Sequence, residues 1–275
     1  MTVGAVKEQQ GEEVSGLYRD GTGWDLFCAE LDAWQAAGRV AGFWWRDDDA
    51  TCPGPKLDRL FDLAGPVPLS LAVIPRTAKG SLARRTADHN GDGGRATILQ
   101  HGYAHRNHAP PAEKKAEFGT HRPAGAMLEE LERGRVSLAA LFGPLFAPVL
   151  TPPWNRIDDA LVSRLAEAGL YGLSRYGPRG SAETDSIVNT HVDIVDWRGS
   201  RGFAGEAVVL EAAVAHLAAR RTGAADPEEP TGLLTHHRDH DEDCWRFIGA
   251  FLLAVEKHPA AGWTTGAAGI GGSPR

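Results

Sequence analysis

The chain has 275 residues, a length at which a single β/α domain can bury a sizeable core. Its composition is that of a folded protein, with 42% hydrophobic and 24% charged residues, and its formal net charge of −7 argues against a nucleic-acid partner. No run approaches about 18 apolar residues, so we expect no membrane span.

Residues 1–22 are polar and glycine-rich and show no apolar period, which predicts a flexible N-terminal arm. After this arm, short apolar or β-branched runs alternate with segments of helical period. The runs that we interpret as strands are, in chain order, Val40–Trp45, Leu69–Ile74, Ala96–Leu99, Pro148–Leu150, Tyr171–Ser174, Ile187–Val195 and Thr231–Thr235.

Apolar residues at steps of three and four predict helices between most of these strands. The predicted helices contain Trp24–Trp34, Leu128–Leu141, Ile157–Leu165, Val209–Ala219 and Trp245–Val255. Gly169 and Gly223 stand where left-handed caps would end the third and the fourth of them.

Seven strands that alternate with helices imply parallel strands joined by crossovers. We expect one domain over residues 23–265, followed by a flexible tail at residues 266–275. A closed or nearly closed β/α barrel suits the strand count, although the pattern also allows a doubly wound open sheet.

Asp47, Asp48 and Asp49 follow the first predicted strand. Three consecutive carboxylates repel one another, and they are costly beside an apolar strand unless a cation or a metal compensates them. A solvated acidic turn is the alternative interpretation.

His101 and His105 follow the third predicted strand. Two imidazoles four residues apart can converge on one side of a helical turn and bind one metal ion. Because this spacing also occurs by chance, it is weak evidence on its own. His108 is interpreted as an outer or surface group and not as a ligand.

Three further polar motifs also follow predicted strands. Two prolines in the segment 151–156 would hold Trp154 at the mouth of the barrel, although a stiff turn with this Trp in the core is equally simple. Asp193 or Asp196 could orient His236, whose imidazole suits a general acid or base. The downstream polar residues Asp239, His240, Asp241, Glu242 and Asp243 are interpreted as a solvated loop and helix start.

All five polar motifs fall just after a predicted strand, and therefore on one face of the expected barrel. The active sites of barrels with parallel strands occupy that carboxyl-terminal face. The shared placement favours one catalytic site over five unrelated surface features.

These motifs, in this order, resemble those of the polysaccharide deacetylase family, also called the NodB-homology domain or carbohydrate esterase family 4. The resemblance is that of a divergent branch and covers about residues 40–240. It implies a distorted (β/α)7 barrel of the NodB type and a metal-dependent hydrolase. The implied reaction is hydrolysis of the N-acetyl amide of a sugar or sugar-containing substrate.

The resemblance implies that His101 and His105 are metal ligands and that one carboxylate of the acidic triplet is the third. Its motif has a base followed by a ligand, which gives Asp48 and Asp49 when Ala50 is aligned with the small residue after the pair. A shift by one residue gives Asp47 and Asp48 instead, and we prefer the first alignment.

His236 matches the general acid of the family, with Leu233 as its buried companion. Trp154 matches the residue whose backbone amide helps to bind the oxyanion. The sequence departs from the family at Thr151, where an arginine normally orients the catalytic Asp. Arg46 or Arg156 could supply that positive charge.

Two imidazoles and one carboxylate suit a divalent metal, Zn²⁺ foremost, with Co²⁺, Mn²⁺ or Ni²⁺ as alternatives. The expected partner is a small-molecule or carbohydrate substrate, on which a rim Trp such as Trp44 or Trp197 could stack, although a core position is an equally simple interpretation for each. An amidohydrolase of the same barrel that acts on a small non-sugar amide is one alternative function. A catalytically silent carbohydrate-binding barrel is another.

The location of the protein is predicted from its cysteines and its first residues. Cys28, Cys52 and Cys244 lie far apart and form neither a metal-ligand pair nor an even disulfide framework. No basic region followed by an apolar stretch opens the sequence, so we expect no secretory signal. Reduced thiols and the lack of a signal predict a cytoplasmic protein.

Overall fold

The computed structural model of the protein describes residues 23–180 and 186–266. The arm predicted for residues 1–22 and all but the first residue of the predicted tail lie outside these ranges. The helices and strands are α2 (Gly23–Ala36), β1 (Ala41–Ala50), α3 (Pro55–Ala64), β2 (Pro68–Val73), α4 (Gly80–Gly91), β3 (Arg95–His101), α5 (Ala124–Phe142), β4 (Phe146–Thr151), α6 (Asp159–Val162), β5 (Gly172–Leu173), β6 (Val192–Asp193), α7 (Glu206–Thr222), β7 (Thr231–Thr235), α8 (Glu242–Lys257) and β8 (Ala261–Trp263).

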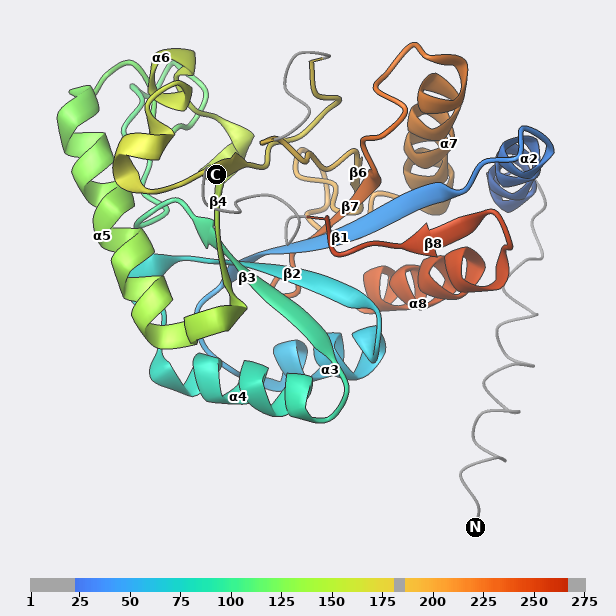
Figure 1. Ribbon diagram of the computed structural model, residues 1–275, viewed down its shortest axis with the longest axis horizontal. Helices are drawn as coiled ribbons and strands as arrows, with labels where there is room; N and C mark the ends of the chain where they lie inside the picture. The colour runs from blue at the N-terminus through green and yellow to red at the C-terminus, as the bar shows by residue number, and fades with distance from the viewer. Residues whose placement is uncertain (1–22, 181–185, 267–275) are drawn as a thin grey trace.

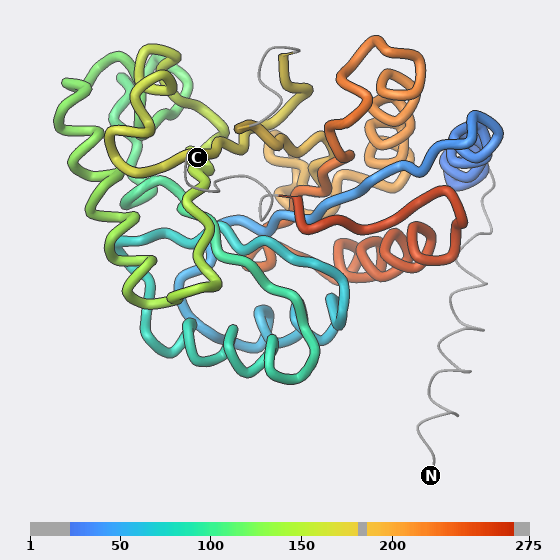
Figure 2. The backbone as a smooth tube through the Cα atoms, in the orientation of Figure 1, coloured from blue at the N-terminus to red at the C-terminus, as the bar shows by residue number. Residues whose placement is uncertain are grey.

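The strands form a curled parallel sheet in the order β5-β4-β3-β2-β1-β7-β6, and β8 pairs with the beginning of β1. Figure 1 shows α3, α4 and α5 on one side of this sheet, and α2, α7 and α8 around its other half. The tube in Figure 2 shows how the chain winds from strand to helix and back around the curled sheet. The expected distorted (β/α)7 barrel is therefore confirmed.

The barrel is least regular between β5 and β6. Isolated parallel bridges join Leu173 to Ile187 and Tyr176 to Thr190, so the segment before β6 lies against the end of β5. The strand predicted over Ile187–Val195 is thus shorter in the structure. It consists of the two residues of β6 and, before them, the two isolated bridges to the end of β5.

Alternation along β1 assigns its side chains to two different surroundings. Phe43 and Trp45 belong to the main core, together with the buried faces of α2 and α8. Trp44 instead packs with Leu99 and Val149 in a small cluster formed by side chains of β1, β2, β3 and β4. The interior of the barrel therefore has its own apolar floor, and the inward side of β1 continues from this floor toward its carboxyl end.

One predicted helix differs from the structure in extent, whereas two predicted caps agree with it. The helix predicted over Ile157–Leu165 is split into α6 and a 3₁₀ turn at Leu165–Ala168. Gly169 and Gly223 do adopt left-handed conformations, with φ of 72° and 81°, as their positions after helical segments predict.

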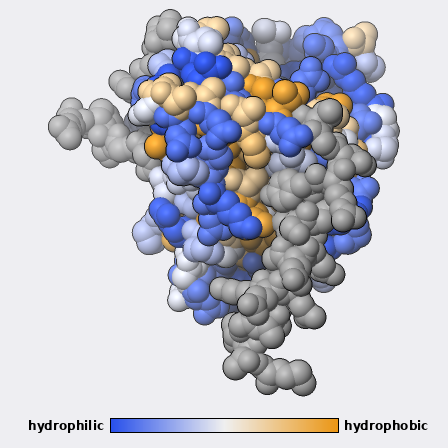
Figure 3. Space-filling view, turned by 90° about the vertical axis from the view of Figure 1, so that its right-hand side faces the viewer, coloured by the Kyte–Doolittle hydropathy of each residue, from blue (hydrophilic) through white to orange (hydrophobic). Residues whose placement is uncertain are grey.

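The outer surface carries scattered apolar side chains, such as Leu26, Val40 and Val208. Figure 3 shows hydrophobic side chains in a band among hydrophilic ones on the side of the molecule that carries α2, α7 and α8. Among the residues described, we find no helix with both the length and the apolar character needed to cross a bilayer.

Candidate metal centre and active site

The carboxyl end of β1 is distorted by one extra residue. Asp47 pairs with Leu71 but Ala50 pairs with Val73, so three steps along β1 match two along β2. Asp49 lies in this bulge with a φ of 70°, a conformation that Asp tolerates better than most residues do. In a regular strand, the Asp49 carboxylate would lie on the opposite face of β1 from Asp48. The bulge changes its direction.

Asp49 lies against both histidines of the predicted metal site. Its Oδ1 atom is 3.1 Å from Nε2 of His101 and 3.3 Å from Nε2 of His105. Oδ1 is buried and has no hydrogen-bond partner of good geometry among the described residues. Three ligand atoms that converge in this way are suited to share one cation.

The tautomer of His101 also suits a metal. Its Nδ1 atom lies 3.0 Å from the carbonyl oxygen of Thr151, which can only accept a hydrogen bond. Nδ1 therefore carries the proton, and the lone pair of Nε2 is directed toward Asp49. A backbone carbonyl is a common outer partner of metal-binding histidines.

His105 lies in a loop and not on the helical turn that the spacing of the two histidines suggested. Gly102 and His105 both have positive φ, 58° and 55°. The buried carboxylate of Glu117 accepts hydrogen bonds from the backbone amides of Tyr103 and Ala104, at 3.2 and 2.7 Å, and so holds the loop. A side chain at Gly102 would collide with Glu117. No sequence pattern pointed to Glu117.

The three groups are electrostatically coupled. Burial acts to raise the pKa of Asp49, but the adjacent His101, together with the charges of His105 and His236, outweighs it and holds the pKa well below its usual range. Burial opposes protonation of His101, yet Asp48 and Asp49 raise its pKa. Burial and the neighbouring His101 lower the pKa of His105. A carboxylate that stays ionised beside two imidazoles favours a cation at this position.

Arg46 holds the second acid of the motif. Its Nε and Nη2 atoms lie 2.9 and 3.0 Å from the two carboxylate oxygens of Asp48, and both side chains are buried. Arg46 also donates to Ser174 and to Asn155, at 2.6 and 2.8 Å. Arg156, the other candidate for the missing arginine, is exposed and donates to the carbonyl of Lys115. Of the two candidates, the structure brings only Arg46 to Asp48.

Asp47 is not part of the cluster around Asp49. It is fully buried, and its carboxylate accepts hydrogen bonds from the hydroxyl of Thr235 and from the backbone amide of His237, at 2.7 and 2.9 Å. The His237 ring also contacts it through Nδ1. Asp47 therefore joins β1 to the segment after β7, a contact for which the sequence offered no signal.

His236 lies near Asp48, with its Nε2 atom 3.9 Å from Oδ2 of that residue. The ring of Trp197 meets the His236 ring edge-on, with 4.6 Å between the ring centres. Trp197 in turn donates to Asp193 at 2.8 Å. Burial raises the pKa of Asp193, whereas the charge of His236 acts to lower it.

Asp196, the other candidate partner of His236, accepts hydrogen bonds from the backbone amides of the loop at Arg198, Gly199 and Ser200. The structure therefore does not bring it to His236. His240 was expected in a solvated loop but is buried, and its Nε2 atom accepts the backbone amide of His236 at 3.1 Å. That part of the prediction is wrong.

The aromatic residues of the motifs have different surroundings. The Trp154 ring lies 4.5 Å from the ring centre of His105, and Trp154 has a φ of 57°. Trp197 is 37% exposed beside His236. Trp44 is fully buried in the floor of the barrel, and it donates to the carbonyl of Asn189. Of the two positions considered for Trp44, rim and core, the structure shows the core.

A second group of possible ligands lies near the other end of β7. His191, His216 and Glu229 are buried, with the His Nε2 atoms 3.4 and 4.0 Å from Oε2 of Glu229. The amide of Gly232 donates to Nδ1 of His191, so the neutral ring carries its proton on Nε2, where a metal would have to bind. The two rings are stacked at 12°, so their in-plane lone pairs run parallel and do not converge. This geometry disfavours a metal at the second group.

Comparison with known proteins shows which solved structures share this fold. No family model matches the chain, and no curated protein does. The structure is similar to that of a protein from Mycobacterium smegmatis assigned to the polysaccharide deacetylases, with a TM-score of 0.55, 16% sequence identity, and coverage of 82% of this chain and 88% of that one.

It is also similar to a mutant of a family 4 carbohydrate esterase pseudoenzyme with restored enzymatic activity. That TM-score is 0.51 at 13% identity, with coverage of 83% of this chain and 67% of that one. The resemblance carried by the five sequence motifs is thus confirmed at the level of the fold, which this chain shares with the polysaccharide deacetylases of carbohydrate esterase family 4.

Proposed function

We propose that the protein is a metal-dependent deacetylase that hydrolyses the N-acetyl amide of a sugar or sugar-containing substrate. The observation that carries this proposal is the convergence of Asp49, His101 and His105 on one point, beside a second acid and a histidine. Two imidazoles and a carboxylate leave positions on a cation open for substrate.

Asp49, His101 and His105 would hold the metal in this proposal, with Zn²⁺ as the first choice and Co²⁺, Mn²⁺ or Ni²⁺ as alternatives. The orphaned Oδ1 of Asp49 and the tautomer of His101 both fit such an ion. A bound divalent ion would polarise the substrate carbonyl and make water a stronger nucleophile at neutral pH.

Asp48 would accept the proton of the attacking water. The two hydrogen bonds from Arg46 keep the Asp48 carboxylate in one orientation. Such positioning is a large part of the efficiency of a general base. His236, 3.9 Å from Asp48, would donate a proton to the departing amine. Trp197, which donates to Asp193, would help to orient this imidazole through its edge-on ring contact. Trp154, beside His105, would contribute its backbone amide to the oxyanion site.

A catalytically silent barrel is the second candidate, because the relative named above is a mutated pseudoenzyme of the same fold. The complete set of Asp48, Asp49, His101, His105 and His236 favours the enzyme. The free thiols of the three cysteines are consistent with a reducing compartment, and we propose a cytoplasmic location on that basis.

The test is release of acetate from N-acetylated sugars by protein loaded with Zn²⁺ or Co²⁺, compared with the chelated protein. The deacetylase proposal expects metal-dependent acetate release. Release of ammonia or of another acid from small non-sugar amides would support the amidohydrolase instead. Bound metal without hydrolysis of either class would contradict the enzyme and favour the silent barrel.

A further inference from the structure

A cavity of about 610 Å³ lies at the amino-terminal end of the barrel strands, between the beginning of β1, the carboxyl end of α7 and the segment before β7. This volume lies within the range of small-molecule sites, roughly 300–1,000 Å³. Gly42, on its wall, is seven residues before Asp49 along β1, which corresponds to about 23 Å of extended chain. The cavity is therefore separate from the candidate metal centre.

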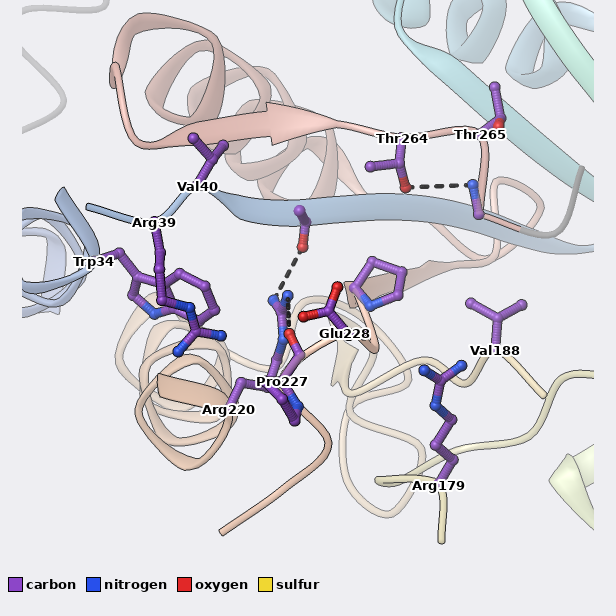
Figure 4. Close-up of a pocket in the computed structure, with 13 residues that line it drawn as sticks. Trp34, Arg39, Val40, Arg179, Val188, Arg220, Pro227, Glu228, Thr264 and Thr265 are labelled. Atoms are coloured by element: carbon purple, nitrogen blue, oxygen red, sulfur yellow. Dashed lines mark hydrogen bonds between the residues drawn. The ribbon is translucent and has the colours of Figure 1, made fainter. Parts of the chain in front are cut away.

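Three arginines lie on the walls of this cavity: Arg39, Arg179 and Arg220. Figure 4 shows Arg39 and Arg220 on the side of Trp34, and Arg179 across the cavity near Val188. The guanidinium groups of Arg39 and Arg220 both lie over the Trp34 ring, at 4.3 and 4.9 Å from its centre. Two cations thus share one small region of the wall.

Arg220 is held in place by its Nη atoms. Nη1 donates to the carbonyl of Gly42 and to the hydroxyl of Thr231, at 3.1 and 3.0 Å, and Nη2 donates to the carbonyl of Pro227 at 3.3 Å. The residue is only 3% exposed, yet its Nε atom has no hydrogen-bond partner among the described residues. Nε is itself closed to solvent, so only the part of the guanidinium group that borders the cavity can meet a ligand.

A guanidinium group matches the two oxygens of a carboxylate or phosphate. Other arginines of this chain bind a carboxylate in this way. These pairs are Arg46 with Asp48, Arg164 with Glu167, Arg179 with Asp226 and Arg221 with Glu30.

The charges around Arg220 also favour an anionic ligand. Burial and the nearby charge of Arg39 lower the pKa of Arg220 to about 10. Glu228, Glu229 and Asp226 oppose this shift through space without overcoming it. Glu229 already accepts the backbone amides of Arg179 and Asn189. Extra negative charge beside Arg220 would therefore be stabilising.

We propose that this cavity binds a small molecule through an oxyanion, a phosphate or carboxylate group, held beside the guanidinium groups of Arg39 and Arg220. The ligand would bind without competing with substrate, because the metal centre lies at the opposite end of β1. Glu228 is an exposed carboxylate on the same wall and weakens anion binding by repulsion.

The test uses the whole chain after chelation, so that metal at the other site cannot capture the probe. Thermal unfolding and calorimetry are followed with inorganic phosphate and, separately, with citrate, at constant ionic strength. We expect saturable binding of at least one probe and, at about 100 times Kd, a rise in Tm of about 5–10 °C. Whichever probe binds identifies the oxyanion.

Arg39→Gln and Arg220→Gln should each weaken binding at least about tenfold, while Glu228→Gln should strengthen it. Arg84→Gln, on the exposed face of α4, is the matched control and should bind like the wild type. If Arg220→Gln fails to fold, Arg39→Gln and Glu228→Gln still decide. Absence of saturable binding overturns the proposal. Equal binding by wild type and Arg39→Gln shows an adventitious ion only and overturns it as well. Neither result depends on whether the protein hydrolyses amides.

Discussion

Arg46 and Asp48 lie two residues apart on β1, and the guanidinium edge of the first binds both carboxylate oxygens of the second. Because side chains alternate along a strand, residues i and i+2 share a face, and here both are directed to the same side as Trp44, in the floor of the barrel. One strand thus supplies both the acid and the cation that orients it.

Replacing Arg46 should damage catalysis while sparing the metal. Arg46→Gln leaves the buried Asp48 without its cation, which typically costs about 3–5 kcal/mol of stability, and a misplaced base should lower kcat by about 100-fold or more. Arg46→Lys should recover only part of the activity, because an ammonium group cannot pair with both oxygens. The measurements are kcat, metal content and urea unfolding.

Arg156→Gln is the matched control, since that exposed side chain contacts only the Lys115 carbonyl among the interactions described. It should keep nearly wild-type kcat. A larger loss of kcat in Arg156→Gln than in Arg46→Gln would show that Arg46 is not the residue that orients Asp48.

The candidate metal ligands give a second prediction. His101→Ala should abolish tight metal binding and hydrolysis together, because it removes the imidazole whose lone pair is fixed by Thr151. Adding Zn²⁺ to chelated wild type should raise the free energy of unfolding by about 2.7 kcal/mol at about 100 times Kd, and His101→Ala should lose this effect. Elemental analysis and thermal unfolding measure both.

His121→Ala serves as the control, because His121 pairs with Glu113 on the surface. It should bind metal as the wild type does. Full hydrolysis by His101→Ala without any metal would refute the role of the centre.

The sequence predicted the parts of the fold that have a strong pattern. The alternation of strands with helices and the ends of β7 follow from apolar runs, and the placement of His101 and His105 follows from their position at the carboxyl end of the third predicted strand. The helix α3 was missed although Leu57, Leu60, Phe61 and Ala64 show helical spacing. By contrast, β8 has only three residues and offers no period. In α4, Leu82 is the sole large apolar residue among those buried, with Thr86 and His89.

The site was less predictable than the fold, for local reasons. Regular alternation places Asp48 and Asp49 on opposite faces of β1, and only the bulge at Asp49 brings both to the mouth. Such a bulge depends on pairing with β2, which one sequence does not display. The choice of Arg46 over Arg156 could have been made from the i, i+2 spacing alone. The contact of Asp47 with His237 joins segments 190 residues apart and had no local signal.

Neighbouring histidines after β7 should respond differently to substitution. His236→Ala should keep the metal and the fold but lower turnover by about 100- to 10,000-fold, as expected for loss of a general acid. His237→Ala should instead lower the free energy of unfolding by up to about 3–5 kcal/mol, because it leaves the buried carboxylate of Asp47 without its ring partner. Turnover of the folded His237→Ala protein should remain closer to that of the wild type.

Single-turnover kinetics and chemical unfolding on both variants separate the two effects. Equal losses of stability in the two variants, with equal losses of turnover, would contradict the assignment of separate roles.

The buried pair His191 and His216 predicts how stability depends on pH. Burial, followed by the charges of His191 and Arg220, lowers the pKa of His216 to about 2, and burial also lowers the pKa of His191. In the unfolded chain both rings titrate near pH 6.5. Below that pH the unfolded state binds protons that the folded state excludes, so the free energy of unfolding falls as the pH falls from about 6.5 toward the folded pKa values. It is insensitive to these rings above that window.

Each excluded proton contributes a slope of about 1.4 kcal/mol per pH unit. Urea unfolding between pH 7.5 and about 4.5, with a chelator present so that metal release does not contribute, should show this decline. His216→Gln removes one of the two titrating rings and should reduce the slope by about one proton, whatever its effect on absolute stability. The same slope in wild type and His216→Gln would mean that the folded protein accepts a proton on this ring, and that the stacked pair with Glu229 is not kept neutral.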